Sequence, residues 1–227
     1  MQRMGSGQGF WTLLTQDERD ALSGLGMRRH YPRRTNLCTE GDPATHVFIL
    51  LAGWVKILSS TKDGHEIVLA LRGNGDIVGE TAGETTGHRN ATIRAIDAVR
   101  ALTVGYDRFG SFLEANPGAN RAYRRVVTRK FNDTDAILRS RTGTSGAQRL
   151  ARVLLDLADR CGQSVNGGIY LVLPLTQDEL ASLSGTSRAT VTRALSRWRK
   201  RDFILTAQRH ITITDLEALR RVAGQQT

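Results

Sequence analysis

The stretch "GDIVGETAGETTGHRNATIRA", residues 75–95, holds a Gly-Glu pair and, after a polar loop, an arginine. Gly79 would let a ligand approach the backbone closely, because glycine has no Cβ. Glu80 could accept a hydrogen bond from a ribose hydroxyl, and Arg89 could donate a pair of hydrogen bonds to a phosphodiester. This pattern suits a ribose that carries a cyclic phosphate. A simple turn at Gly79 and a surface ion pair between Glu80 and Arg89 would explain the same residues.

A second candidate is the stretch "GTSRATVTRALSRWRKR", residues 185–201, which is basic and contains no acidic residue. Val191, Leu195 and Trp198 are spaced one helical turn apart, so they would face a core while the basic side chains face outward. Such a helix either is solvated or contacts a polyanion.

The residues before and within this stretch favour a helix-turn-helix. Ala181 is small enough for a close helix crossing, Gly185 tolerates the turn, and Val191 could seal the corner. Ser187 is a good N-cap for the second helix. A hairpin expected over residues 203–214 would make the unit winged.

We expect the first turns of that second helix to enter a major groove and its basic end to contact phosphates. Arg188 and Arg193 would each donate to guanine, whereas Ala189 could make only a methyl-sized contact. The expected DNA-contact set is Thr176, Ser187, Arg188, Ala189, Thr190, Thr192, Arg193, Arg197, Lys200, Arg201 and Arg209.

The 227-residue chain has a formal net charge of +10, which favours a polyanionic partner. Cys38 and Cys161 have no partner at metal-ligand or disulfide-framework spacing, so we expect neither kind of site. No apolar run approaches the ~20 residues that span a bilayer, and no nucleophile elbow or phosphate-binding P-loop is present. We therefore expect a cytoplasmic protein that has no membrane partner and is not an enzyme.

The elements that must position these residues change along the chain. Thr15 and Glu18 stand at capping-box spacing before a short helix, and Thr176 and Glu179 repeat that signal. Residues 30–105 form short runs rich in β-branched residues, which predict an all-β unit, with a hairpin turn at 62–64.

Residues 117–142 predict one long helix, since neither Pro nor Gly interrupts it after Gly118. Its apolar stripe has coiled-coil-like spacing and would either form a seam with a second helix or pack on its own β unit. The stripe consists of Tyr123, Val127, Phe131, Thr134 and Leu138.

Residues 141–146, "RTGTSG", would break this helix and separate two domains. The elements expected after the break are a helix at 147–161, a turn at 166–168, a strand at 169–173, two helices over 177–201 and the hairpin at 203–214.

The motifs "EGD", "VFILLAGWVKI", "KDGHE", "GDIVGE", "RNAT" and "TSRATVTRAL", with the long helix, occur in an order that resembles the Crp/Fnr family. The resemblance covers about residues 10–216. It implies an α+β fold: an N-terminal β jelly-roll effector domain of the cyclic-nucleotide-binding type at 10–116, a long dimerisation helix at 117–142 and a C-terminal winged helix-turn-helix at 147–220. It also implies a homodimeric bacterial transcription regulator that binds an inverted-repeat DNA operator and has RNA polymerase as a partner.

In the cyclic-nucleotide branch of that family, the resemblance assigns the Gly-Glu pair and the arginine to the ribose phosphate, and Thr134 to the adenine. Asn90 stands where Ser or Thr is usual, and residues 81–84 lack the usual bulky apolar side chains. Asp135 replaces a neutral polar residue and could accept from adenine or guanine. The expected effector-binding set is Gly79, Glu80, Arg89, Asn90, Thr134 and Asp135, with cyclic AMP or cyclic GMP as the ligand.

Three alternatives are weighed against this interpretation. The same fold could respond to another effector or to none, although two cysteines are too few for an iron–sulfur branch. A haem-dependent version would need an axial ligand, and the five histidines fit exposed or core positions better. An enzyme with a regulatory nucleotide domain lacks a catalytic constellation.

Overall fold

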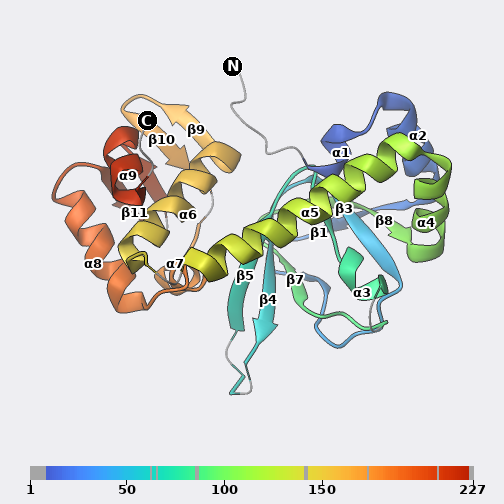
Figure 1. Ribbon diagram of the computed structural model, residues 1–227, viewed down its shortest axis with the longest axis horizontal. Helices are drawn as coiled ribbons and strands as arrows, with labels where there is room; N and C mark the ends of the chain where they lie inside the picture. Colours follow the sequence, from blue (N-terminus) through green and yellow to red (C-terminus); the bar gives the residue numbers. More distant parts are fainter. Residues whose placement is uncertain are drawn as a thin grey trace. The chain divides into compact units, whose positions relative to one another are not determined.

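The computed structural model describes residues 9–61, 63–64, 66–84, 87–140, 143–172, 174–208 and 210–224, with the backbone alone for 83–84 and 133–140 (Figure 1). The chain divides into two compact units, and the boundary falls between Asn132 and Asp133. None of the described helices combines the length and the hydrophobicity needed to cross a bilayer.

The first unit is built on two four-stranded antiparallel sheets, with strand orders β1-β8-β3-β6 and β2-β7-β4-β5. The predicted all-β unit and its jelly-roll fold class are confirmed. The expected turn at 62–64 lies between β4 and β5 but falls partly outside the described residues. The strands are β1 (Met27–Tyr31), β2 (Asn36–Cys38), β3 (His46–Ala52), β4 (Val55–Ser60), β5 (Glu66–Arg72), β6 (Ile77–Val78), β7 (Thr92–Ala95) and β8 (Val99–Gly105).

Strand β3 shows how the sequence produces two cores. Successive side chains of a strand point to opposite faces, so a continuous apolar run can serve both. Phe48 and Leu50 belong to the cluster between the two sheets. Val47 and Ile49 belong to a second cluster, on the outer face of the same sheet.

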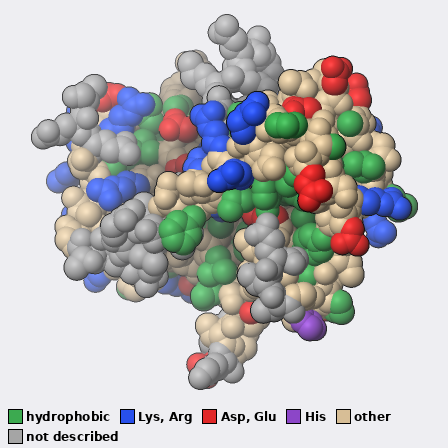
Figure 2. All heavy atoms as spheres, turned by 45° about the vertical axis from the view of Figure 1, so that its right-hand side comes forward, with side chains coloured by type: hydrophobic (Ala, Val, Ile, Leu, Met, Phe, Trp, Pro, Cys, Tyr) green, Lys and Arg blue, Asp and Glu red, His purple; other side chains and the backbone are tan. Residues whose placement is uncertain are grey.

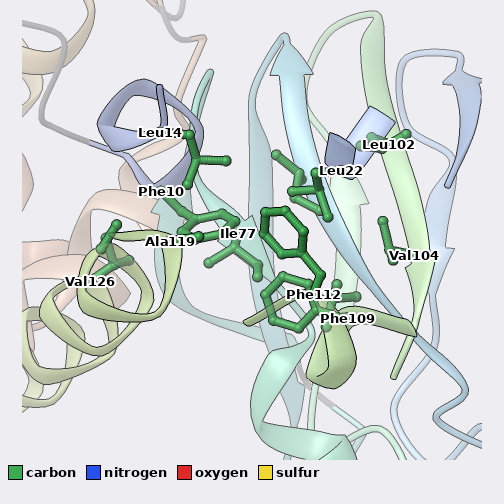
Figure 3. Packing of buried hydrophobic residues seen from close by; sticks show 13 residues of the cluster. Phe10, Leu14, Leu22, Ile77, Leu102, Val104, Phe109, Phe112, Ala119 and Val126 are labelled. Carbon is green, nitrogen blue, oxygen red and sulfur yellow. The ribbon is translucent and has the colours of Figure 1, made fainter. Parts of the chain in front are cut away.

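Helices cover that outer face. Their buried side chains, among them Phe10, Phe109 and Phe112, meet Ile77 and Val126 in one apolar core (Figure 3). The helices of this part of the chain are α1 (Phe10–Leu13), α2 (Gln16–Leu25), α3 (Glu80–Glu84), α4 (Tyr106–Ala115) and α5 (Pro117–Ser140), and all but α3 contribute side chains to this core. The predicted capping box of Thr15 and Glu18 at the start of α2 is confirmed.

The long helix α5 uses a different stripe from the predicted one. Ala119, Ala122 and Val126 are buried against its own unit. The ring of Tyr123 packs edge-on against those of Phe10 and Phe109, with centroid distances of 6.2 and 5.5 Å. Tyr123 therefore packs on its own β unit, which is one of the two alternatives that the sequence left open.

Farther along α5, Phe131 is 68% exposed, as a residue of an intermolecular seam would be in a single chain. Thr134 and Leu138 lie within α5, but their side chains fall outside the described part of the structure.

The second unit contains a four-stranded sheet of order β11-β12-β10-β9 with helices around it. The elements are α6 (Gly146–Cys161), β9 (Gly162–Val165), β10 (Gly168–Leu171), α7 (Gln177–Ser184), α8 (Arg188–Arg199), β11 (Ile204–Ala207), β12 (His210–Ile213) and α9 (Leu216–Ala223). The winged helix-turn-helix was predicted from the sequence, whereas strand β9 and helix α9 were not. Strand β9 escaped notice because its sequence, "GQSV", is short, polar and mostly exposed.

On the face shown in Figure 2, charge alone does not mark a binding surface. Lys and Arg side chains lie there at several separate places with Asp and Glu side chains between them. The local geometry must therefore identify the sites.

Candidate effector site and DNA-binding surface

Gly79 follows strand β6 with a φ of +78°, a conformation that favours glycine. A Cβ at this position would lie 2.5 Å from Nη1 of Arg89. The positive φ and the close packing of Arg89 against the backbone both favour glycine here.

Arg89 is 3% exposed and turned into the first unit. Its Nη1 donates to the carbonyl of Gly79 at 3.1 Å and to the hydroxyl of Tyr106 at 3.2 Å, and its Nη2 donates to the carbonyl of His46 at 2.8 Å. The guanidinium also lies 5.2 Å from the ring centroid of Phe48. Its buried Nε has no hydrogen-bond partner among the described atoms. A buried donor without a partner is costly, so this atom suits an anionic ligand.

Glu80 begins helix α3 and is 6% exposed. Its Oε1 accepts from Nζ of Lys130 on α5 at 2.6 Å, and the same Nζ donates to the carbonyl of Ile77 at 2.5 Å. Burial lowers the pKa of Lys130 and nearby Arg72 lowers it further, while Glu80 opposes both effects. The alternative of a surface ion pair between Glu80 and Arg89 is wrong, because both residues are buried.

Of the other predicted effector residues, the structure describes the side chain of Asn90 but not those of Thr134 and Asp135. The amide of Asn90 donates to the hydroxyl of Thr81 at 3.2 Å, beside Glu80. Thr134 and Asp135 lie in α5, but their side chains are outside the described part. The structure therefore brings Gly79, Glu80, Arg89 and Asn90 together at the start of α3.

The second unit contains the predicted helix-turn-helix. Helix α7 ends at Gly185, which has the left-handed φ of +56° and whose N–H donates to the carbonyl of Ala181. Ser187 caps α8 by accepting from the N–H of Thr190 at 3.2 Å. Val191 and Trp198 are buried as predicted.

The predicted reading residues lie on the outside of α8. The exposed ones are Arg188, Ala189, Thr192, Arg193 and Arg197, followed by Lys200 and Arg201 after the helix. The hydroxyl of Thr176 accepts from the N–H of Glu179 at 3.2 Å, as the N-cap of α7. Arg209 falls outside the described residues.

Contacts between the helices hold several of these side chains. The carboxylate of Asp178 lies 3.5 Å from Nη1 of Arg188. The hydroxyl of Thr192 donates to Oε1 of Gln177 at 2.6 Å. Both partners come from the first turn of α7.

Arg149 on α6 holds the turn between α7 and α8 through hydrogen bonds to its backbone. Its Nε and Nη2 donate to the carbonyls of Ser184 and Gly185, each at 2.9 Å, and its Nη1 donates to the carbonyl of Thr144 at 2.6 Å. One guanidinium thus ties the turn of the helix-turn-helix to the segment just before α6.

Within the described ranges, no cluster of three or more His, Cys, Asp or Glu side chains could hold a metal ion.

Comparison with known proteins identifies both units. Residues 28–116 match the model of the cyclic nucleotide-binding domain, and residues 148–222 match that of the Crp-like helix-turn-helix domain. A CRP-like cAMP-activated global transcriptional regulator of Mycobacterium tuberculosis is 33% identical over 193 residues, which cover 85% of this chain and 86% of that protein. This chain belongs to the Crp/Fnr family of transcription regulators.

Solved structures with low sequence identity share the Crp/Fnr fold. The c-di-GMP responsive global regulator CLP of Xanthomonas campestris has a TM-score of 0.75 at 24% identity, covering 88% of this chain and 99% of that one. A CooA variant from Carboxydothermus hydrogenoformans has a TM-score of 0.76 at 23% identity, covering 97% and 98% of the two chains. The Mycobacterium tuberculosis relative is named as a transcriptional regulator, and the match to the Crp-like helix-turn-helix domain gives this Crp/Fnr protein a DNA-binding role.

Sequence reasoning missed several residues that contact the candidate sites: Tyr106 and Lys130 in the first unit, and Arg149, Gln177 and Asp178 in the second. Lys130 had a usable signal. It continues the buried stripe of Ala119, Ala122 and Val126 at helical spacing, so a charged residue at that position needs a buried partner. The others had none, because their contacts depend on the tertiary fold.

Proposed function

We propose that this protein is a homodimeric regulator whose DNA binding is controlled by a cyclic purine nucleotide, cyclic AMP or cyclic GMP, bound in the first unit. One observation carries the proposal. The buried Nε of Arg89 has no partner among the described atoms and lies in the residue set that would cradle a ribose phosphate. A phosphodiester oxygen would supply the missing acceptor and neutralise the buried charge.

Each neighbouring residue has a role in this proposal. Lys130 occupies Oε1 of Glu80, and Oε2 could accept from a ribose hydroxyl while Oε1 keeps its ion pair. Asn90 would add a donor near the phosphate, and Thr134 with Asp135 would contact the base. Tyr106 and Gly79 would orient the guanidinium of Arg89 from the opposite side.

The relatives support more than one effector. The Mycobacterium tuberculosis relative is named as cAMP-activated, whereas CLP is named as c-di-GMP responsive. The internal hydrogen bonds of Arg89 favour a rival proposal, in which the same fold uses another effector or none.

We place DNA recognition on the first turns of α8. Arg188 and Arg193 would donate to guanine O6 and N7, and Ala189 would contact a thymine methyl group or tolerate several bases. A dimer formed through α5 at Phe131 would present two such helices about 34 Å apart, which predicts an inverted-repeat operator. RNA polymerase as partner and a cytoplasmic location complete the proposal.

Calorimetry with cyclic AMP and cyclic GMP tests the effector. Replacing Arg89 with Leu should weaken nucleotide binding by about 2 to 5 kcal/mol, because the phosphate charge would lose its buried partner. Replacing the exposed Arg121 with Leu is the matched control and should leave affinity unchanged. Equal affinity in the wild type and the Arg89→Leu variant would refute this assignment.

A further inference from the structure

The ion pair between Asp178 and Arg188 joins the two helices of the helix-turn-helix at their first turns. Asp178 is the second residue of α7 and Arg188 is the first residue of α8. The carboxylate and the guanidinium are 3.5 Å apart, and their side chains are 67% and 68% exposed. Neither partner is needed to fill a core, so the pair has no packing role.

A carboxylate at this position is unfavourable for simple attraction to DNA. Arg188 lies on the face that we place in the major groove, and a negative charge beside it would be repelled by the phosphates. A residue that lowers affinity for every sequence is expected at such a position only if it contributes something else.

Orientation of Arg188 is such a contribution. A free arginine loses much rotamer freedom when it binds, and a guanidinium that is already held loses less. Arginine has five N–H donors, so one edge can contact Asp178 while the other donates to guanine O6 and N7.

The other reading arginine provides an internal comparison. The Nη2 of Arg193 lies 3.4 Å from the hydroxyl of Thr190, a neutral group one turn away on the same helix. Only a weak constraint acts on Arg193 in that contact, whereas Arg188 contacts a charged group on another helix.

We infer that Asp178 is a specificity-determining residue, which positions Arg188 for guanine and reduces binding to other bases. The inference rests on the proposed reading role of Arg188. It predicts that loss of the carboxylate increases binding to DNA in general and decreases the preference for guanine at one position of each half-site.

The test is a selection from random duplex DNA, followed by competition binding of single-base variants of the selected site. It compares the wild type with Asp178→Asn, Arg188→Ala and the double variant. The control is Asp156→Asn, which removes an exposed carboxylate of the same unit that lies 3.6 Å from Arg160. Both single Asp→Asn changes add the same charge, so their difference isolates the contact with Arg188.

The guanine preference at the Arg188 position should fall about two- to five-fold in Asp178→Asn, the range of an exposed ion pair. It should stay unchanged at the Arg193 position and in Asp156→Asn. In the Arg188→Ala background, the Asp178→Asn change should have no further effect on base preference.

Two results would overturn the inference in distinguishable ways. If Asp178→Asn and Asp156→Asn give the same preference at every base, Asp178 acts only as a surface charge, and the reading role of Arg188 stands. If Arg188→Ala itself changes no base preference, the proposed reading position is wrong, and the role of Asp178 falls with it.

Discussion

Glu80 and Lys130, fifty residues apart in sequence, form a buried ion pair with 2.6 Å between Oε1 and Nζ. It joins the start of helix α3, beside the candidate phosphate site, to helix α5. A ligand that contacts Glu80 would therefore act on a residue already linked to the long helix.

The Lys130→Met variant should lose about 3 kcal/mol of unfolding free energy, because a carboxylate would remain buried without its partner. Urea denaturation measures this loss. Adding Glu80→Gln should restore part of it, since the charge is then absent. The exposed Arg129→Met is the control, and an equal loss there would show that the ion pair is not responsible.

Phe131 offers a test of the dimer proposed through α5. Its side chain is 68% exposed, and a Phe131→Glu change would place like charges together in an apolar interface. Sedimentation should then show a monomer, whereas the exposed neighbour Arg129→Glu should leave a dimer. A dimer in both variants would assign the interface to another surface.

His46 gives the first unit a pH dependence. Burial lowers the pKa of His46, and nearby Arg89 and Arg29 lower it further. As the pH falls through the usual His range, the unfolded chain therefore binds more protons than the folded one. The contribution of the neutral His46 to the free energy of unfolding is lost over that range. Between about pH 7.5 and about pH 5.5, the wild type should lose more unfolding free energy than His46→Gln. Parallel losses in urea denaturation would contradict this cause.

Arg149 should affect DNA binding without contacting DNA. In Arg149→Met the carbonyls of Ser184, Gly185 and Thr144 lose their common donor, at a cost of about 1–3 kcal/mol. We expect affinity for operator DNA to fall about tenfold, which corresponds to 1.4 kcal/mol. Arg152→Met is the control, because Arg152 on the same helix donates instead to the carbonyl of Ala223 at 2.9 Å. Equal affinities in the two variants would show that the hydrogen bonds of Arg149 do not position α8.

The recognition helix was predictable because local rules determine it. The N-cap Ser187, the turn at Gly185 and the buried Val191 and Trp198 each follow from their own neighbours in the sequence. Capping and helical periodicity involve residues only a few positions apart, so a short stretch of sequence is enough to predict this helix.

The effector site was predictable only in composition. Gly79, Glu80 and Arg89 are the expected residue types, but their partners Lys130 and Tyr106 lie 50 and 17 residues away from Glu80 and Arg89 respectively. The sequence left two partners open for the stripe that contains Tyr123, and only the contacts of its ring with Phe10 and Phe109 show that it packs on its own unit. Such contacts are set by the tertiary fold.

The most direct test of the proposed regulation is the affinity for a selected inverted-repeat operator, measured by fluorescence anisotropy with and without saturating cyclic AMP or cyclic GMP. If one of these nucleotides controls DNA binding, it should change the dissociation constant on the order of tenfold in the wild type and not in Arg89→Leu. The same dissociation constant in the wild type with either nucleotide and with none would contradict the proposal that a cyclic purine nucleotide is the effector.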